Sequence, residues 1–81
     1  MPRIRVNKIL WDGRNTAHAT QRASKAQIES ILLGWHDASR NKKGRAAKYT
    51  LKGVAYDGTT WEVKFNFSGN VARPITAFKS K

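Results

Sequence analysis

The chain contains no cysteine and few acidic residues. The lack of cysteine excludes disulfides, thiolate zinc sites and a cysteine nucleophile. Only 5 Asp and Glu accompany 16 Lys and Arg, which gives a formal net charge of +11 over 81 residues. The carboxylates are scattered, with no metal-binding His or Asp spacing, and no glycine-rich loop is present to cradle a phosphate. We therefore expect no metal and no cofactor.

Long hydrophobic runs are also missing. The opening "MPRIRVNKILWDG" is basic, but its apolar run is too short for a signal peptide. No segment approaches the length of a membrane span. We expect a soluble, cytoplasmic protein with a single domain over residues 1–81.

The basic excess predicts an anionic partner. Nucleic acid is the usual ligand of a basic folded domain. An acidic protein and an anionic membrane are the alternatives. The membrane has least support, because no segment combines a basic helix face with a wide apolar one. The remaining alternative is that the basic residues keep the protein soluble and bind no ligand.

The first half of the sequence predicts one strand and two helices. Residues 4–11 are rich in strand formers and end at a Asp-Gly turn, and the polar residues 14–23 fit a short surface helix. Ser24 and Gln27 form a capping-box pattern that opens the next helix. Gly34 stands where a left-handed helix stop is expected. Apolar side chains recur between them at helical spacing: Ile28, Ile31, Leu32 and Trp35.

The second half predicts a basic loop and an antiparallel meander. Residues 36–48 read either as a solvated connector or as an arm that contacts phosphates. Strands are expected over 48–56, 59–67 and 71–78, joined by turns at 57–58 and 68–70. The expected fold is α+β, with two N-terminal helices packed on a small antiparallel sheet in the order β-α-α-β-β-β.

The last expected strand raises two questions. Pro74 has no N–H, so it indicates an edge or irregular strand. A free edge could pair with a second copy, which makes a homodimer an option. Arg73 either binds phosphate on a concave sheet face or pairs with a carboxylate such as Asp12 or Glu62.

Three stretches resemble the BrnT-like toxins: "WDGRNTAHATQRASKAQIESILLG", "GRAAKYTLKGVAYDGTTWEVKF" and "RPITAFK". The positions that fit the family's opening are Trp11, Asp12, Asn15, His18, Ser24, Gln27, Ile28 and Leu32. Phe78 stands where the family's closing strand has an arginine, and the sequence stops at Lys81 without the family's basic C-terminal helix. The chain thus resembles a divergent member.

This resemblance implies a fold like that of the RelE and ParE toxins. It implies a small bacterial or phage toxin that cleaves RNA without a metal and has an antitoxin as partner. Metal-independent cleavage needs proton transfer and stabilisation of the phosphate. The expected catalytic residues are His18 and Arg73. The expected nucleic-acid-binding residues are Arg40, Lys42, Lys43, Arg45, Lys48 and Lys79.

A second hypothesis is a non-catalytic module on the same fold. Such a module would bind DNA, RNA or a host protein through its basic surface. Salt-sensitive binding without cleavage would indicate the module. Cleavage that depends on His18 or Arg73 would indicate the enzyme.

Overall fold

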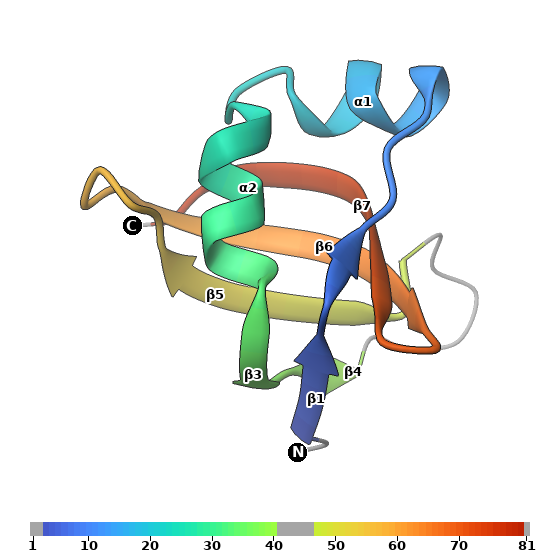
Figure 1. Cartoon of the computed structure of the whole chain (residues 1–81). Coiled ribbons are helices and arrows are strands. Elements are labelled where there is room, and N and C mark those ends of the chain that lie inside the picture. The colour runs from blue at the N-terminus through green and yellow to red at the C-terminus, as the bar shows by residue number, and fades with distance from the viewer. Residues whose placement is uncertain (1–2, 41–46, 81) are drawn as a thin grey trace.

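The computed structural model describes residues 3–40 and 47–80 (Figure 1). Its elements are β1 (Arg3–Val6), β2 (Lys8–Ile9), α1 (Gly13–Ala19), α2 (Lys25–Leu32), β3 (Gly34–Asp37), β4 (Ser39–Arg40), β5 (Tyr49–Val54), β6 (Thr60–Ser68) and β7 (Val71–Lys79). The expected order β-α-α-β-β-β is therefore wrong. The single first strand is two short strands, and two further strands, β3 and β4, precede the meander.

Strands β3 and β4 occupy residues for which the sequence predicted the end of a helix and the start of a basic loop. Most of their side chains are exposed, so the alternation of apolar and polar residues that marks a half-buried strand is missing. Ala38, between the two strands, is fully buried and anchors the segment to the core. Their pairing with β1 and β5 is a tertiary effect that no local pattern indicates.

The sheet is mixed, which corrects the expected antiparallel sheet. The order β2-β7-β6-β5-β4 includes a parallel pairing of β2 with β7, and β1 and β3 form a separate antiparallel ribbon. Asn7 alone separates β1 from β2, and Ala38 alone separates β3 from β4. The β1–β2 segment and the β3–β4 segment thus each act as one bent strand that belongs to both sheets. The pairings close into a barrel-like ring, with the bends acting as corners.

Helix α1 begins at a reciprocal cap. The Asp12 carboxylate accepts hydrogen bonds from the backbone N–H groups of Arg14 and Asn15, and the Asn15 side chain accepts one from the backbone of Asp12. The cap satisfies N–H groups that have no partner inside the helix. The helix packs against β7 and buries Ala19.

Helix α2 confirms the predicted capping box of Ser24 and Gln27. Its apolar stripe is buried at Ile28, Ile31 and Leu32. The helix nevertheless ends at Leu32 and not at Trp35, which lies in β3 and is 58% exposed. Gly34 has the positive φ of 101° expected of a helix stop, and it turns the chain directly into β3.

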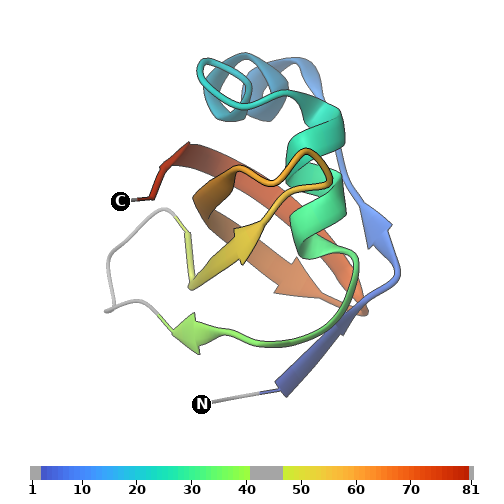
Figure 2. The same ribbon diagram turned by 90° about the vertical axis from the view of Figure 1, so that its left-hand side faces the viewer.

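The two helices do not form one layer. Helix α2 packs against β5 and β7 and covers one side of the sheet, whereas α1 packs against β7 above it (Figure 1). Seen after a quarter turn, α2 lies on one side of the sheet and no helix of the described chain lies on the other (Figure 2). We call this second side the outer face. It carries the side chains of β5, β6 and β7 that point away from α2.

Strand β7 is irregular, as Pro74 predicts, but it is not a free edge at its start. Phe65 pairs with Pro74 and Lys64 with Thr76, so Ile75 is an extra residue in a bulge. Val71 and Ala72 pair with β2, and α1 packs against the strand. The sequence makes a homodimer an option because the last strand could have an open edge. Over Val71 and Ala72 that edge is occupied by β2, so a second copy cannot pair there. No helix in the described ranges is long and apolar enough to cross a membrane.

Candidate nucleic-acid interface

The outer face follows from the alternation along β6. Trp61, Val63 and Phe65 are buried beneath α2, so Glu62, Lys64 and Asn66 point to the opposite side. Register places further residues beside them on that side: Thr50 and Lys52 of β5, and Arg73, Thr76 and Phe78 of β7. The result is a polar surface in which cations predominate.

Lys64 lies at the centre of the outer face. Its ammonium nitrogen is 3.2 Å from the Thr50 hydroxyl and 3.9 Å from a Glu62 carboxylate oxygen. It also lies 5.8 Å from the centroid of the Phe78 ring, within the range of a cation–π contact. The Phe78 ring therefore lies against a cation of the outer face.

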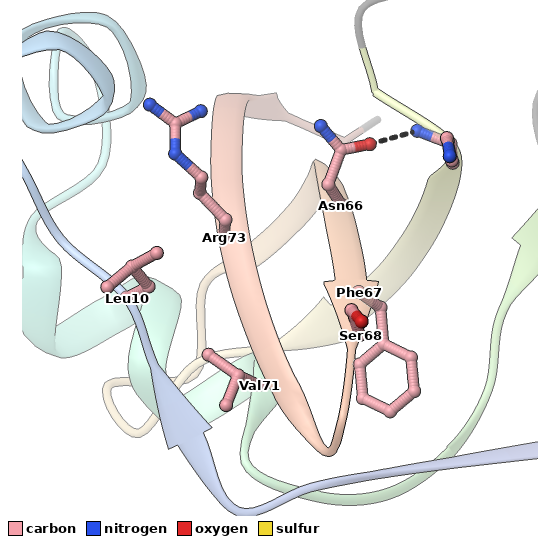
Figure 3. A pocket seen from close by; sticks show the side chains of 7 residues that line it. Leu10, Asn66, Phe67, Ser68, Val71 and Arg73 are labelled. Carbon is pink, nitrogen blue, oxygen red and sulfur yellow. Dashed lines mark hydrogen bonds between the residues drawn. The ribbon is translucent and has the colours of Figure 1, made fainter.

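A pocket of about 470 Å³ opens at one end of the outer face. Leu10, Phe67 and Val71 form its apolar part, and its polar residues are Lys48, Asn66, Ser68 and Arg73 (Figure 3). The Asn66 side-chain oxygen accepts a hydrogen bond of 2.9 Å from the backbone N–H of Lys48, which ties the start of β5 to β6. The pocket thus combines an apolar floor with two cations at its rim.

Arg73 is held by Asp12, one of the two carboxylate partners proposed from the sequence. A guanidinium nitrogen donates to the carboxylate at 2.9 Å, and both side chains are partly exposed. A guanidinium carries five N–H donors, of which this contact uses one. The backbone hydrogen bond from Asn15, followed by the bond from Arg73, lowers the pKa of Asp12 below its usual value. Asp12 is therefore a stable anionic anchor for Arg73.

Asn15 fixes the geometry around this ion pair. It is the only buried polar or charged residue in the described chain, and its amide donates to the carbonyls of Leu10 and Pro74 at 2.9 and 3.0 Å. These bonds join the start of α1 to β7 immediately after Arg73. The relative position of Asp12 and Arg73 is thus set by a buried side chain.

A second pocket, of about 310 Å³, also includes Arg73 in its lining. It is lined by Arg14, Asn15, His18, Arg73 and Ile75. The structure therefore brings the two expected catalytic residues, His18 and Arg73, to one pocket. His18 projects from α1 and is exposed. The arrangement offers an imidazole for proton exchange beside two guanidiniums that attract a phosphate.

The expected nucleic-acid-binding residues are not gathered at one place. Lys48 and Arg73 both line the larger pocket, with Asn66 between them (Figure 3). Arg40 stacks on the Tyr49 ring at 5.6 Å, and its register partner Tyr49 points away from the outer face. Lys79 pairs with the buried Trp61 and so belongs to the opposite side from Phe78. Three further expected residues lie outside the described ranges: Lys42, Lys43 and Arg45.

Sequence reasoning missed several members of the interface. Lys52 and Lys64 were not proposed as ligands, although the alternation along residues 59–67 already placed Lys64 on the polar face. Arg14 follows the cap of α1 and had no distinguishing motif. Within the described residues, no group of three His, Cys, Asp or Glu side chains lies close enough to hold a metal ion.

Comparison with known proteins finds no matching family model, no similar curated protein and no similar solved structure. The resemblance to BrnT-like toxins, with the toxin activity and the antitoxin partner it implies, therefore stays a prediction. The site has to be interpreted from its own chemistry.

Proposed function

We propose that this protein binds nucleic acid through the outer face and the pockets beside Arg73. The observation that carries the proposal is the excess of cations without an acidic partner. Among the described residues only Lys64 and Arg73 form ion pairs. Meanwhile Asp12, Asp57, Glu29 and Glu62 already have partners within the protein. The remaining positive charge favours a polyanion.

The shape of the outer face supports the same ligand. Lys52, Lys64 and Arg73 lie on the adjacent strands β5, β6 and β7, and Lys48 immediately precedes β5. Their charged groups can therefore follow a phosphate backbone across the sheet. Asn66 and Thr76 add hydrogen-bonding groups between them. This surface would hold the backbone, and backbone contacts give affinity without sequence preference.

Salt-dependent binding tests the proposal. The logarithm of the binding constant for an oligonucleotide should fall linearly with the logarithm of the salt concentration, and the slope of this line reports the number of phosphate contacts. Lys48→Gln, Lys52→Gln and Arg73→Gln should each reduce the slope by about 0.7 to 0.9 if one phosphate contact is lost. Arg22→Gln, in the connection between the helices, is the matched control and should leave the slope unchanged. An affinity that does not change with salt concentration, or a slope that these substitutions do not alter, would contradict the proposal.

A second candidate function is metal-independent RNA cleavage at the smaller pocket. One observation favours it: His18 and Arg73 both line that pocket. His18 would take the proton from the 2′-hydroxyl as that oxygen bonds to phosphorus, and return a proton to the 5′-oxygen as its bond to phosphorus breaks. Arg14 and Arg73 would stabilise the charge on the phosphate. The test is RNA cleavage in the presence of a chelator, with His18→Ala as the variant. Cleavage that persists in His18→Ala, or no cleavage by the unmodified protein, would leave only the binding function.

A further inference from the structure

The ribbon of β1 and β3 carries an exposed tryptophan beside two arginines. Trp35 is paired with Arg5 across the ribbon. Arg3 lies two residues before Arg5, so the two point to the same side of β1. The guanidinium carbons of Arg3 and Arg5 lie 5.5 and 5.7 Å from the centroid of the Trp35 ring. Ile4 and Val6 are buried, so this side faces outward. We call the three residues the Arg–Trp–Arg cluster.

Trp35 differs from the other two tryptophans. The indole N–H of Trp11 donates to Glu29, and that of Trp61 donates to Thr59. In the described part of the chain, Trp35 has no hydrogen-bond partner for its indole, and 58% of the residue is exposed. It contributes little to the core. Its large apolar ring is instead available on the surface.

Neither arginine of the cluster forms an ion pair with a carboxylate of the described residues. Asp37 is the register partner of Arg3 across the ribbon, so it offsets part of the charge of that arginine without pairing with it, and Arg5 has Trp35 opposite it. Two like charges held against one ring repel each other, and a bound anion would relieve that repulsion. The cluster thus offers an aromatic face and two guanidiniums at one place, and it is separate in the chain from the site around Arg73.

We propose that the Arg–Trp–Arg cluster binds single-stranded nucleic acid, with an unpaired base stacked on Trp35 and adjacent phosphates on Arg3 and Arg5. The inference rests on the proposed nucleic-acid binding and specifies the form of the ligand. Aromatic side chains bind single strands because every base has a π-face on which they stack. In a duplex both faces of each base are covered by its neighbours, so this contact is lost.

The contacts within the cluster can be replaced by contacts with a single strand, in which a base takes the place of a guanidinium on the Trp35 ring. An exposed cation–π contact is weaker than the stacking of a base on an aromatic ring. A guanidinium that leaves the ring for a neighbouring phosphate keeps a favourable partner, and the ring face becomes available to the base. The stacking contact is independent of base identity, so it adds preference for single strands without sequence specificity.

The test compares Trp35→Ala with the unmodified protein on three ligands. These are a mixed-sequence single strand of about 12 nucleotides, within the length that one small domain covers, its duplex, and the same strand with abasic sites. Trp35→Ala should lower affinity for the intact single strand about tenfold and leave the other two unchanged. Trp35→Phe should retain most of the affinity. Tyr56→Ala, which removes another exposed aromatic ring, is the matched control and should change nothing.

The outcomes separate this inference from the function on which it rests. If the unmodified protein binds no nucleic acid at low salt, the proposed function fails and the cluster has no role in it. If it binds, but Trp35→Ala weakens all three ligands equally or none of them, only the stacking inference is overturned. Competition by polyglutamate as effective as that by the single strand would also overturn it. Arg3→Gln and Arg5→Gln should each lower the salt slope by about 0.7, and unchanged slopes would refute the phosphate contacts.

Discussion

Arg73 and Asp12 lie 61 positions apart in the sequence and meet in an ion pair of 2.9 Å. Asp12 caps α1, and Arg73 of β7 lines two pockets. The contact therefore has two consequences. It fastens the helix to the sheet, and it occupies part of the guanidinium that we propose binds phosphate.

Removing the charge of Asp12 should strengthen nucleic-acid binding. Asparagine caps helices as well as aspartate does, so Asp12→Asn preserves the start of α1 while it releases Arg73. We expect the affinity for an oligonucleotide to rise about fivefold, because Asp12 no longer competes with phosphate for the Arg73 guanidinium and an exposed ion pair is weak. Asp57→Asn changes the net charge equally, but its carboxylate contacts Gln27 and Thr59. Equal effects of the two variants would show that only net charge matters.

Acid should destabilise the fold through Asp12 and Asp57. The backbone bond from Asn15 is the main cause that lowers the pKa of Asp12, and the Thr59 hydroxyl is the main cause for Asp57. A lowered pKa stabilises the folded state at pH values above the usual 3.8, and this contribution is lost as the pH falls through the lowered pKa. Urea midpoints measured from about pH 7 down to about pH 2 should fall less steeply in Asp12→Asn and Asp57→Asn than in the unmodified protein. Parallel curves would contradict this assignment.

The local elements could be predicted wherever the signal lies in adjacent residues. The capping box of Ser24 and Gln27, the Asp57–Gly58 turn and the alternation around Val63 all appear in the structure close to where the sequence placed them. These patterns depend on backbone geometry and on the burial of one face, which are encoded within a few residues.

The closure of the sheet could not be predicted in the same way. The parallel pairing of β2 and β7 involves only Lys8 and Ile9 on one strand, and nothing near them indicates a partner. The bulge at Ile75 also shifts the alternation of β7. Arg73 therefore shares the outer face with Phe78, a relationship that simple counting along the strand excludes.

Asn15 should be among the most sensitive polar positions. It is 2% exposed and bonds to two carbonyls from different segments. Asn15→Ala leaves these buried carbonyls without that partner, and we expect a loss of about 1–3 kcal/mol in the free energy of unfolding. Urea denaturation measures it, with the exposed Asn7→Ala as the control. A loss below about 0.5 kcal/mol would show that the carbonyls find other partners.

Asn15 positions α1 against β7, so removal of the Asn15 side chain should also affect the ligand site. We expect Asn15→Ala to weaken oligonucleotide binding even at temperatures where the variant is fully folded. A variant that is destabilised but binds normally would show that Arg73 keeps its position without this buried link.

The approach of α2 to β5 depends on Gly53. A Cβ atom at this position would lie 2.9 Å from Cγ2 of Ile31, which is too close for an ordinary contact. Ile31 is β-branched and buried, so its methyl group has little room to rotate away. Gly53→Ala should therefore destabilise the protein by about 1–3 kcal/mol, as overpacked cores do.

Two further variants isolate that steric cause. Gly13→Ala, at the start of α1, places a Cβ where nothing lies within 4 Å, so it should not destabilise the protein and should at most raise its stability by about 0.4–1 kcal/mol. Ile31→Ala removes the methyl group that Gly53→Ala would meet, so the double variant should be more stable than the sum of the two single losses predicts. Urea denaturation of the four proteins gives the coupling energy, which we expect to be about 0.5–3 kcal/mol. Additive losses would mean that β5 shifts to accommodate the added atom and that the contact with Ile31 does not fix the distance between helix and sheet.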